Sequence, residues 1–471
     1  MSRRNGGIIG PVNTPVGGLT TGVAGGVWRM NDVLTFVSNS QWPKTPENIE
    51  NSCRFNNDSS DYLIRTPSSA SNRDAWTLSL WIKRCNLGTY QSIYGIYADA
   101  NNQENFGFDD SDRFFWQLYQ SGSAVGQLTS NRVFRDTSAW YHIVAVYDSE
   151  NSTAGNRMRL YINSVEETSF ATDTNPSSGL DSLWNSTTAH SIGRINTTNY
   201  VDMYLAEFVH VDGQVLDPTS FGETDSTTGI WKPRKIGQQF GTAGTNGFYL
   251  DFKDSSNLGN DASGLNNDFT VNNLTSIDQS TDTCVNNYCT LNSLAKPGTG
   301  NMPPLAEGNL HYNKINTGSG NNAQINGTIG VSSGKYYFEI KPADSSAQVV
   351  GISTVQPLFD THGGGISSSA LGVGVVYYNN GTKYVNGTNS SYGDTWTTND
   401  IIGCAFDLDN NFVYFSKNGT FQDSGDPTSG STGTGGIACT ANIIYTPTIQ
   451  NNNYNAATST FMNFGSPPYS I

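Results

Sequence analysis

Acidic side chains that lie close together are the first candidates for catalysis in this chain of 471 residues. A retaining glycoside hydrolase needs two carboxyl groups about 5–5.5 Å apart, which one strand can supply in a pattern such as Glu-x-Asp-x-x-Glu. The nearest candidates do not repeat this pattern: Glu166-Glu167, Glu207 with Asp212, and Glu223-Thr224-Asp225. We therefore expect no enzymatic activity and no catalytic residue, and we interpret Glu207 as a strand-edge or loop-tethering residue.

A second acidic group raises the question of a metal site. Asp109, Asp110 and Asp112 lie in one short segment, and Ca²⁺ takes about 6–8 oxygen ligands. Three carboxylates would supply part of that shell, so a calcium site stays an alternative to the simpler interpretation, a solvated acidic turn. Residues 407–411 are similar but lack the glycine and the distal glutamate of an EF-hand loop, which indicates a hairpin turn. We expect no bound metal and no cofactor.

The histidines and cysteines are isolated from one another and from nucleophile motifs. No Cys-x-x-Cys pair or His-Glu-x-x-His sequence occurs. We interpret His142 and His210 as strand residues and the cysteines as reduced structural thiols. The remaining candidates for ligand binding are aromatic side chains, because Tyr and Trp rings in loops can stack on sugars. The ligand-binding candidates are Tyr119, Trp184, Tyr200, Tyr384 and Tyr392, whereas Trp116 and Trp396 are expected in the core.

The composition limits the classes of partner that this chain can bind. Lys plus Arg total 25 and Asp plus Glu total 40, which leaves a net charge of −15. An acidic surface repels phosphates, so we exclude nucleic acid as a partner. No apolar run has the length of a signal-peptide core or a membrane-spanning helix, so we expect no membrane insertion. Charged residues make up only 14% of the chain, too few for the solvent faces of long amphipathic helices.

The elements that must position the candidates are short alternating strands. The sequence predicts an all-β protein of two β-sandwich (jelly-roll-like) domains, at residues 51–222 and 311–471, joined by a structured connector at 223–310. Residues 1–50 are rich in glycine and carry scattered apolar side chains that such a segment cannot bury on itself. We interpret residues 1–50 as an extended docking arm, with Ile8, Ile9, Trp28 and Trp42 as its contact residues.

Three stretches of the first sandwich resemble the laminin G-like, concanavalin A-like family: residues 76–84, 140–147 and 204–213. Three stretches of the second are similar to SPRY domains: residues 333–340, 400–409 and 413–419. Domains of the first family bind glycans or proteins, and SPRY domains bind proteins through their loops. The resemblance therefore implies a binding protein, although fold alone does not dictate function.

The arrangement as a whole resembles structural proteins of tailed bacteriophages, particularly marine ones, through residues 6–15, 221–225 and 247–252. This resemblance implies a virion protein, made in the host cytoplasm and placed on the tail or the capsid surface. The arm would dock on other virion proteins, the chain would form a homo-oligomer, with a trimer favoured, and the sandwiches would contact host-surface glycan or protein. A tail fibre or other surface appendage is the first interpretation. A capsid head fibre or decoration protein is the alternative, and a glycan hydrolase on a concanavalin-like fold is a second one.

Overall fold

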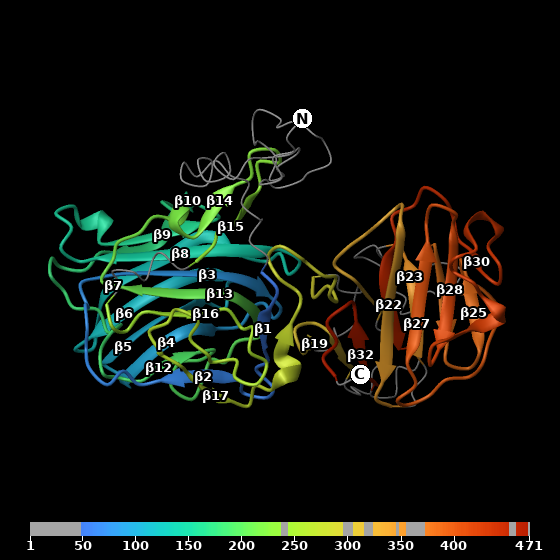
Figure 1. Ribbon diagram of the computed structural model, residues 1–471, viewed down its shortest axis with the longest axis horizontal. Helices are drawn as coiled ribbons and strands as arrows, with labels where there is room; N and C mark the ends of the chain where they lie inside the picture. The colour runs from blue at the N-terminus through green and yellow to red at the C-terminus, as the bar shows by residue number, and fades with distance from the viewer. Residues whose placement is uncertain are drawn as a thin grey trace, which may run out of the picture.

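The computed structural model describes residues 49–236, 244–294, 305–314, 324–344, 348–354, 373–451 and 458–469. The predicted docking residues Ile8, Ile9, Trp28 and Trp42 lie outside these ranges. Within them the chain is built from antiparallel strands that form two sandwiches side by side (Figure 1). The predicted all-β class is confirmed. The helical segments are single 3-10 turns at Ala154–Asn156, Pro218–Ser220, Ser276–Asp278, Gln422–Ser424 and Gly430–Thr432.

The first sheet of the first sandwich has the strand order β10-β9-β8-β3-β13-β1-β18, and β16 also pairs with β13. Its centre is the long antiparallel pair of β3 and β13, in which Trp76 lies opposite Asp212. The strands are β1 (Ser52–Phe55), β3 (Ala75–Arg84), β8 (Trp140–Asp148), β9 (Met158–Ile162), β10 (Val165–Glu166), β13 (Met203–Asp212), β16 (Phe248–Leu250) and β18 (Gln279–Ser280).

The second sheet of the first sandwich packs face to face with the first and has the order β11-β7-β6-β5-β4-β12-β2-β17. Because successive side chains of a strand point to opposite faces, half of its residues reach the core and half point outward. The strands are β2 (Tyr62–Arg65), β4 (Gln91–Asp99), β5 (Asn102–Phe108), β6 (Arg113–Gln120), β7 (Ser123–Val133), β11 (Phe170–Thr174), β12 (His190–Ile192) and β17 (Thr270–Asn272).

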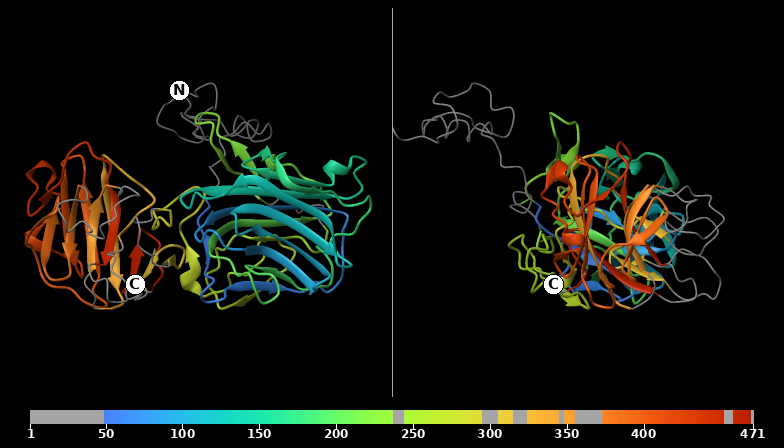
Figure 2. Two further views of the ribbon diagram at one scale, coloured as in Figure 1. Left: turned by 180° about the vertical axis from the view of Figure 1, so that it is seen from behind. Right: turned by 90° about the vertical axis from the view of Figure 1, so that its right-hand side faces the viewer.

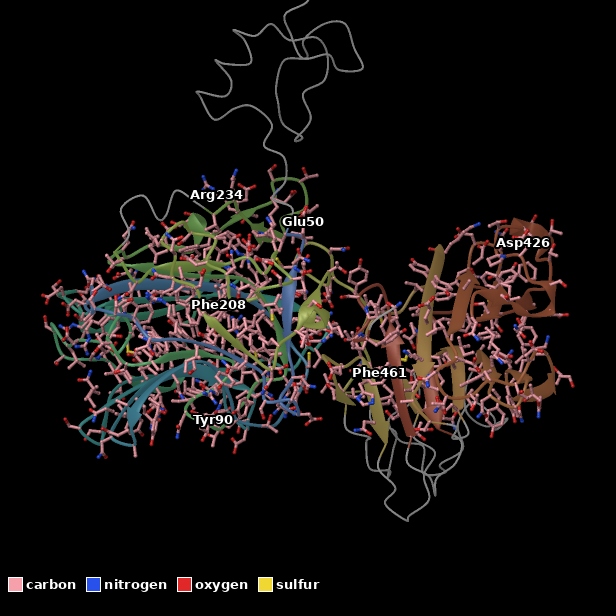
Figure 3. The ribbon with its side chains drawn as sticks, turned by 60° about the horizontal axis from the view of Figure 1, so that its bottom comes forward. Glu50, Tyr90, Phe208, Arg234, Asp426 and Phe461 are labelled. Atoms are coloured by element: carbon pink, nitrogen blue, oxygen red, sulfur yellow. The ribbon has the colours of Figure 1, made fainter. Side chains whose placement is uncertain are left out.

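Aromatic rings dominate the core between these two sheets. Trp76 packs against Trp116 with ring centroids 5.2 Å apart and stacks on Tyr147 at 5.6 Å. Trp76 and Trp116 have no exposed surface, which confirms the core position expected for Trp116. Phe208 lies in the interior of the sandwich in Figure 3 and is likewise fully buried. The core therefore consists of interlocking rings rather than aliphatic side chains alone.

The connector completes the first sandwich instead of standing apart from it. Strands β16, β17 and β18 come from residues 248–280 and pair with β13, β2 and β1. Phe248, Leu250 and Phe269 are buried in the first core. Residue 222, the predicted end of the first domain, is therefore not a structural boundary. The alternating apolar residues of the connector need a partner sheet, and the first sandwich supplies it.

The outer face of the first sheet is covered by the chain that follows β13. A hairpin of β14 (Gly222–Thr224) and β15 (Trp231–Pro233) lies over it. There His142 lies between Trp81 and Trp231, with ring centroids 4.7 and 5.9 Å apart. The Trp231 Nε1–H donates to His142 Nδ1 at 2.9 Å. Among the described residues, this hairpin therefore covers part of the outer face of the first sheet.

The second sandwich repeats the two-layer plan with less regular strands. One sheet has the order β19-β20-β32-β22-β27-β28-β29, with β30 beside β28, and the other has the order β21-β31-β23-β24-β25-β26. The first contains β19 (Leu305–Ala306), β20 (His311–Lys314), β22 (Lys335–Pro342), β27 (Ile402–Asp407), β28 (Phe412–Lys417), β29 (Thr420–Phe421), β30 (Ile437–Ala438) and β32 (Thr458–Asn463). The second contains β21 (Gln324–Asn326), β23 (Gln348–Ser353), β24 (Gly374–Tyr378), β25 (Thr382–Val385), β26 (Thr388–Ser391) and β31 (Thr446–Asn451).

The two sandwiches meet at a polar junction beneath the connector, which lies between them in Figures 1 and 2. The Tyr204 hydroxyl donates to the Gly308 carbonyl at 3.0 Å, and Asn309 Nδ2 donates to the Cys85 carbonyl at 3.2 Å. Nearby, the buried Lys83 Nζ lies 2.7 Å from Asp282 Oδ2. Because these bonds are largely buried, the junction fixes the second sandwich against one end of the first.

Candidate functional site

A continuous row of uncharged side chains crosses the outer face of the 8-stranded second sheet. Directly opposed residues of antiparallel strands lie on the same face, so the strand register defines the row. Glu104, Phe106 and Trp116 point into the core, and their neighbours along the strands therefore point outward. From one edge of the sheet to the other, the row consists of Thr270, Ile64, Ser191, Gly95, Asn105, Gln117, Gln127 and Thr174.

Tyrosines flank the amides of this row on both sides. Tyr97, Gln103 and Tyr119 form the neighbouring row across β4, β5 and β6. On the other side Tyr90 stacks on Phe115 with ring centroids 4.6 Å apart. Figure 3 shows Tyr90 at the margin of the first sandwich. We call this surface the amide–tyrosine face; its members are Tyr90, Tyr97, Gln103, Asn105, Gln117, Tyr119 and Gln127.

The amide–tyrosine face offers hydrogen bonds and flat apolar surface without charge. A side-chain amide carries two N–H donors and an acceptor oxygen, and a phenol both donates and accepts. Within the described residues, the amides of Gln103 and Gln117 have no hydrogen-bond partner in the chain. Burial raises the pKa of Tyr90 to about 12, so its hydroxyl stays neutral. This chemistry suits a neutral polyhydroxylated ligand, whose hydroxyls pair with amides while its C–H faces rest on the rings.

A loop at residues 193–200 rises over one side of this face. A Cβ atom added at Gly95 would lie 2.9 Å from the Arg194 carbonyl oxygen, so only glycine allows the loop to lie this close to β4. The Ser92 N–H donates to the Asn199 carbonyl at 2.9 Å, which ties the loop to the same strand. The loop places the predicted ligand residue Tyr200 beside Arg194, whose Nη1 donates to the Tyr200 hydroxyl at 3.1 Å.

Of the predicted ligand residues in the first sandwich, Tyr119 lies on the amide–tyrosine face and Tyr200 lies on the adjacent loop. The surface position expected for Trp184 is wrong. Its side chain is fully buried, and its ring stacks on Tyr94 at 3.8 Å and on Phe106 at 5.2 Å. Trp184 lies outside any strand, yet the loop that carries it folds inward, and a local sequence pattern does not reveal that direction.

The tyrosines proposed for the second sandwich have different environments. Tyr384 is half-buried on the outer face of β25, 6.2 Å from Tyr378 between ring centroids. Tyr392 packs against Tyr377 and Phe415, and its hydroxyl accepts the Phe415 N–H at 3.2 Å. Tyr392 is therefore partly buried, and its role as a ligand residue stays a prediction.

The Asp109-Asp110-Asp112 loop is held by arginines. Asp109 Oδ2 lies 2.7 Å from the Arg113 guanidinium, and Asp112 accepts from Arg84 at 3.0 Å and from Arg135 at 2.9 Å. Asp109 and Asp112 are buried, which corrects the interpretation as a solvated turn. Their negative charge is balanced inside the protein, and within the described ranges no three acidic, histidine or cysteine side chains group as metal ligands.

The carboxylates that could serve acid–base chemistry are separated and enclosed. Glu207 accepts the Tyr249 hydroxyl at 2.7 Å and is buried at a bulge of the central strand β13. Its expected position at a strand edge is therefore wrong, whereas its bond to Tyr249 of β16 does tether the connector. Glu104 lies in the core, where it accepts bonds from Trp116, Ser182 and Leu183.

The buried histidines are neutral strand residues rather than bases. Burial lowers the pKa of His142, His190 and His210 to about 3. His210 Nε2 lies 2.9 Å from Asn185 Oδ1, and His142 Nε2 lies 2.8 Å from Ser79 Oγ. Burial likewise raises the pKa of the Cys53, Cys85 and Cys404 thiols well above its ordinary value, which keeps them unreactive.

Sequence reasoning missed the amides and tyrosines that accompany Tyr119: Tyr90, Tyr97, Gln103, Asn105, Gln117 and Gln127. A signal exists in the strand at residues 102–108, where Gln103 and Asn105 alternate with the core residues Glu104 and Phe106. Alternation alone identifies an outward-facing amide, but not its neighbours on other strands. Which residues of neighbouring strands lie in the same row depends on the strand register, and the register is a property of the assembled sheet.

Comparison with known proteins separates the chain into two matched regions. Residues 57–220 match the family Laminin_G_3, described as the concanavalin A-like lectin/glucanases superfamily, and residues 335–437 match the SPRY domain. The ATP-dependent RNA helicases DDX1 of Xenopus laevis and Ddx1 of Drosophila melanogaster are 39% and 37% identical to this chain. These matches extend over 92 and 93 residues, 20% of this chain and 12% of each helicase. They involve part of the SPRY region alone.

Three solved structures are similar in fold. Domains LG4-5 of the mouse laminin alpha1 chain are 11% identical, with a TM-score of 0.30, over 90% of this chain and 92% of that one. A heptameric SAP-like pentraxin of Limulus polyphemus is 15% identical, with a TM-score of 0.30, over 43% and 94%. The SPRY domain of human HERC1 is 17% identical, with a TM-score of 0.25, over 33% and 89%.

The described residues contain no helix long and apolar enough to cross a membrane. Both family matches fall inside the sandwiches expected from the sequence, at 51–222 and 311–471. The strands of each region form the corresponding two-layer fold. Residues 57–220 are thus similar to the concanavalin A-like lectin/glucanases superfamily, and residues 335–437 are similar to SPRY domains.

Proposed function

We propose that this chain is a non-catalytic adhesion protein of a virion, which holds a glycan of the host surface on the amide–tyrosine face of its first sandwich. The observation that carries the proposal is the uncharged row of Asn105, Gln117 and Gln127, flanked by Tyr119 and Tyr90. Next to this row and within it, the amides of Gln103 and Gln117 have no hydrogen-bond partner among the described residues, so they stay available to a ligand. They match the hydroxyl groups of a sugar chain.

The direct test measures binding of the full chain to polysaccharides isolated from the host envelope. Gln117→Leu removes both donors and the acceptor at the centre of the face, and Tyr119→Ala removes a ring. We expect each variant to bind about tenfold more weakly, which corresponds to the loss of one or two hydrogen bonds or one stacking contact. Tyr384→Ala is the matched control, because it removes a half-buried tyrosine from the outer face of the second sandwich.

Two outcomes would contradict this assignment. Unchanged binding by Gln117→Leu and Tyr119→Ala, with loss in Tyr384→Ala, would move the ligand to the second sandwich. Failure of the unmodified chain to bind any host polysaccharide would overturn glycan adhesion. Isothermal titration of the same preparations, with thermal unfolding as a check on folding, separates these cases.

The virion assignment is supported by the resemblance to tailed-phage structural proteins, and its arm stays a prediction. Residues 1–50 would dock on other virion proteins through Ile8, Ile9, Trp28 and Trp42, and the chain would assemble as a homo-oligomer, with a trimer favoured. Deleting residues 1–45 should leave folded protein that no longer joins the particle. A truncated chain that is still incorporated would contradict the docking role. Cryo-electron microscopy of whole particles separates a tail appendage from a head fibre or decoration protein.

A further inference from the structure

The loop beside the amide–tyrosine face carries an arginine in an unusual setting. The Arg194 Cζ atom lies 3.3 Å from the centroid of the Tyr62 ring, and Arg194 Nη1 donates to the Tyr200 hydroxyl. Tyr62 belongs to β2, where Leu63 faces the core, so Tyr62 lies on the same outer face of the sheet. Two rings from separate segments therefore hold the guanidinium in one orientation.

No acidic side chain among the described residues forms an ion pair with Arg194. Its Nε is buried and has no hydrogen-bond partner in the described chain. Among the described arginines of this sandwich, some are matched with carboxylates (Arg54 with Glu307, Arg84 and Arg135 with Asp112, Arg113 with Asp109). Arg65, Arg157 and Arg159 bond to amide, carbonyl or hydroxyl groups instead. Arg194 differs from these three in lying beside the amide–tyrosine face, in the loop that is tied to β4.

We propose that Arg194, held between Tyr62 and Tyr200, binds an anionic substituent of the glycan, so that the ligand is an acidic polysaccharide. This inference rests on the proposed glycan binding by the neighbouring face. A guanidinium presents parallel N–H donors that match the two oxygens of a carboxylate or a sulfate. Because the rings already hold the group, little side-chain entropy is lost when the anion binds. The uncharged amides then contact the neutral part of the sugar chain.

The test compares three oligosaccharides of equal length: a neutral galactose oligomer, its uronic acid counterpart and a sulfated form. Titrations use the full chain at one fixed ionic strength, because the acidic protein repels both charged probes at long range. We expect at least one charged oligomer to bind about tenfold more tightly than the neutral one. The stronger of the two charged oligomers identifies the substituent as a carboxylate or a sulfate.

Three variants assign the preference to Arg194. Arg194→Gln should abolish the preference and leave affinity for the neutral oligomer unchanged. Arg194→Lys should retain part of it, since lysine keeps the charge but not the paired donors. Tyr62→Leu should weaken it by freeing the guanidinium. An unchanged preference in Arg194→Gln, or no preference in the unmodified chain, would overturn the inference.

The same titrations distinguish failure of this inference from failure of the proposed glycan binding on which it rests. Binding of all three oligomers with equal affinity, lost in Gln117→Leu, would leave glycan adhesion intact and remove the role of Arg194. Binding of none of them, together with no binding to host polysaccharide, would overturn both proposals. Thermal unfolding of each variant checks that a lost preference is not a folding defect.

Discussion

The two sandwiches share a two-layer architecture, but particular amide side chains in them have different roles. In the second sandwich the buried amide of Asn326 is bonded within the protein: its Nδ2 donates to Ser353 Oγ at 2.9 Å and to Thr446 Oγ1 at 2.8 Å. In the first sandwich Gln103 and Gln117 point outward. An amide that faces inward must find a partner within the protein, whereas an outward amide is available to a ligand. The comparison therefore supports the proposal that the first sandwich binds the ligand.

The cores differ as well. The first core encloses Glu104, His190 and His210 among aromatic rings. Within the described residues of the second sandwich, Asp407 is the only buried Asp, Glu, His, Lys or Arg, and it pairs with Lys335 at 3.0 Å. Burying an ionisable group shifts its pKa and makes folding depend on pH. Stability of the first sandwich should thus respond to pH near neutrality, whereas the lowered pKa of Asp407 confines the response of the second sandwich to acidic pH.

The largest expected effect comes from removing a ring from one core. Trp184→Ala deletes the side chain that stacks on Tyr94 and Phe106 and should lower the free energy of unfolding of the first sandwich by about 3–5 kcal/mol. Hydrogen exchange, measured separately on β6 and β27, should show lost protection in β6 alone. Trp396→Ala is the matched change in the second core and should give the reverse pattern. Equal loss in both strands would show that the sandwiches unfold as one unit.

A smaller expected effect is the difference between the two sandwiches in how their free energy of unfolding depends on pH. Burial raises the pKa of Glu104 to about 7 and that of Asp202 to about 8. A raised folded-state pKa stabilises the fold at low pH, and this stability is lost as the pH rises through that pKa. Between pH 6.5 and 8.5 the first sandwich should lose about 2–3 kcal/mol.

The buried histidines act in the opposite sense but at lower pH. Their lowered pKa of about 3 stabilises the fold above the ordinary histidine pKa of about 6.5, and that contribution is lost as the pH falls toward 3. Unfolded histidines still titrate between about pH 6.5 and 7.5, so the rise of this contribution offsets part of the carboxyl effect in that interval, and above it the contribution is constant. Glu104→Gln with Asp202→Asn should flatten the decline, as followed by hydrogen exchange of β6. An equal decline in β27 would contradict the difference between the cores.

The smallest expected effect is confined to a turn of the second sandwich. Asn418 and Gly419 have φ values of 50° and 81°, as expected for the Asn-Gly turn at these positions. A Cβ at Gly419 meets no atom within 4 Å, so Gly419→Ala tests the backbone alone and should cost about 1 kcal/mol. Gly155→Ala in the first sandwich also meets no neighbour but has no positive φ, and it should not be destabilising. Chemical denaturation of both variants measures the difference.

Local patterns were sufficient for the elements and for part of the site. The alternation in residues 76–82 predicts a strand, and β3 spans Ala75–Arg84. Tyr119 was identified as a ligand residue, but Gln103 and Gln117, which flank it on the amide–tyrosine face, were not. The sequence predicts Trp184 as a ligand residue because it lies in a loop, although its ring is buried in the core. The alternation of side chains along a strand assigns them to the two faces of the sheet. It does not show which face another part of the chain covers.

The sequence by itself determined the all-β class, the two sandwiches and the turns between strands, because these depend on residues within a few positions of one another. Tertiary structure alone decided that Asp112 pairs with Arg84 and Arg135, and that Arg194 lies on Tyr62. It also decided that the amide row crosses the second sheet while the hairpin of β14 and β15 covers the first. Such contacts join residues distant in the chain, and they exist only once register and packing have brought the strands together.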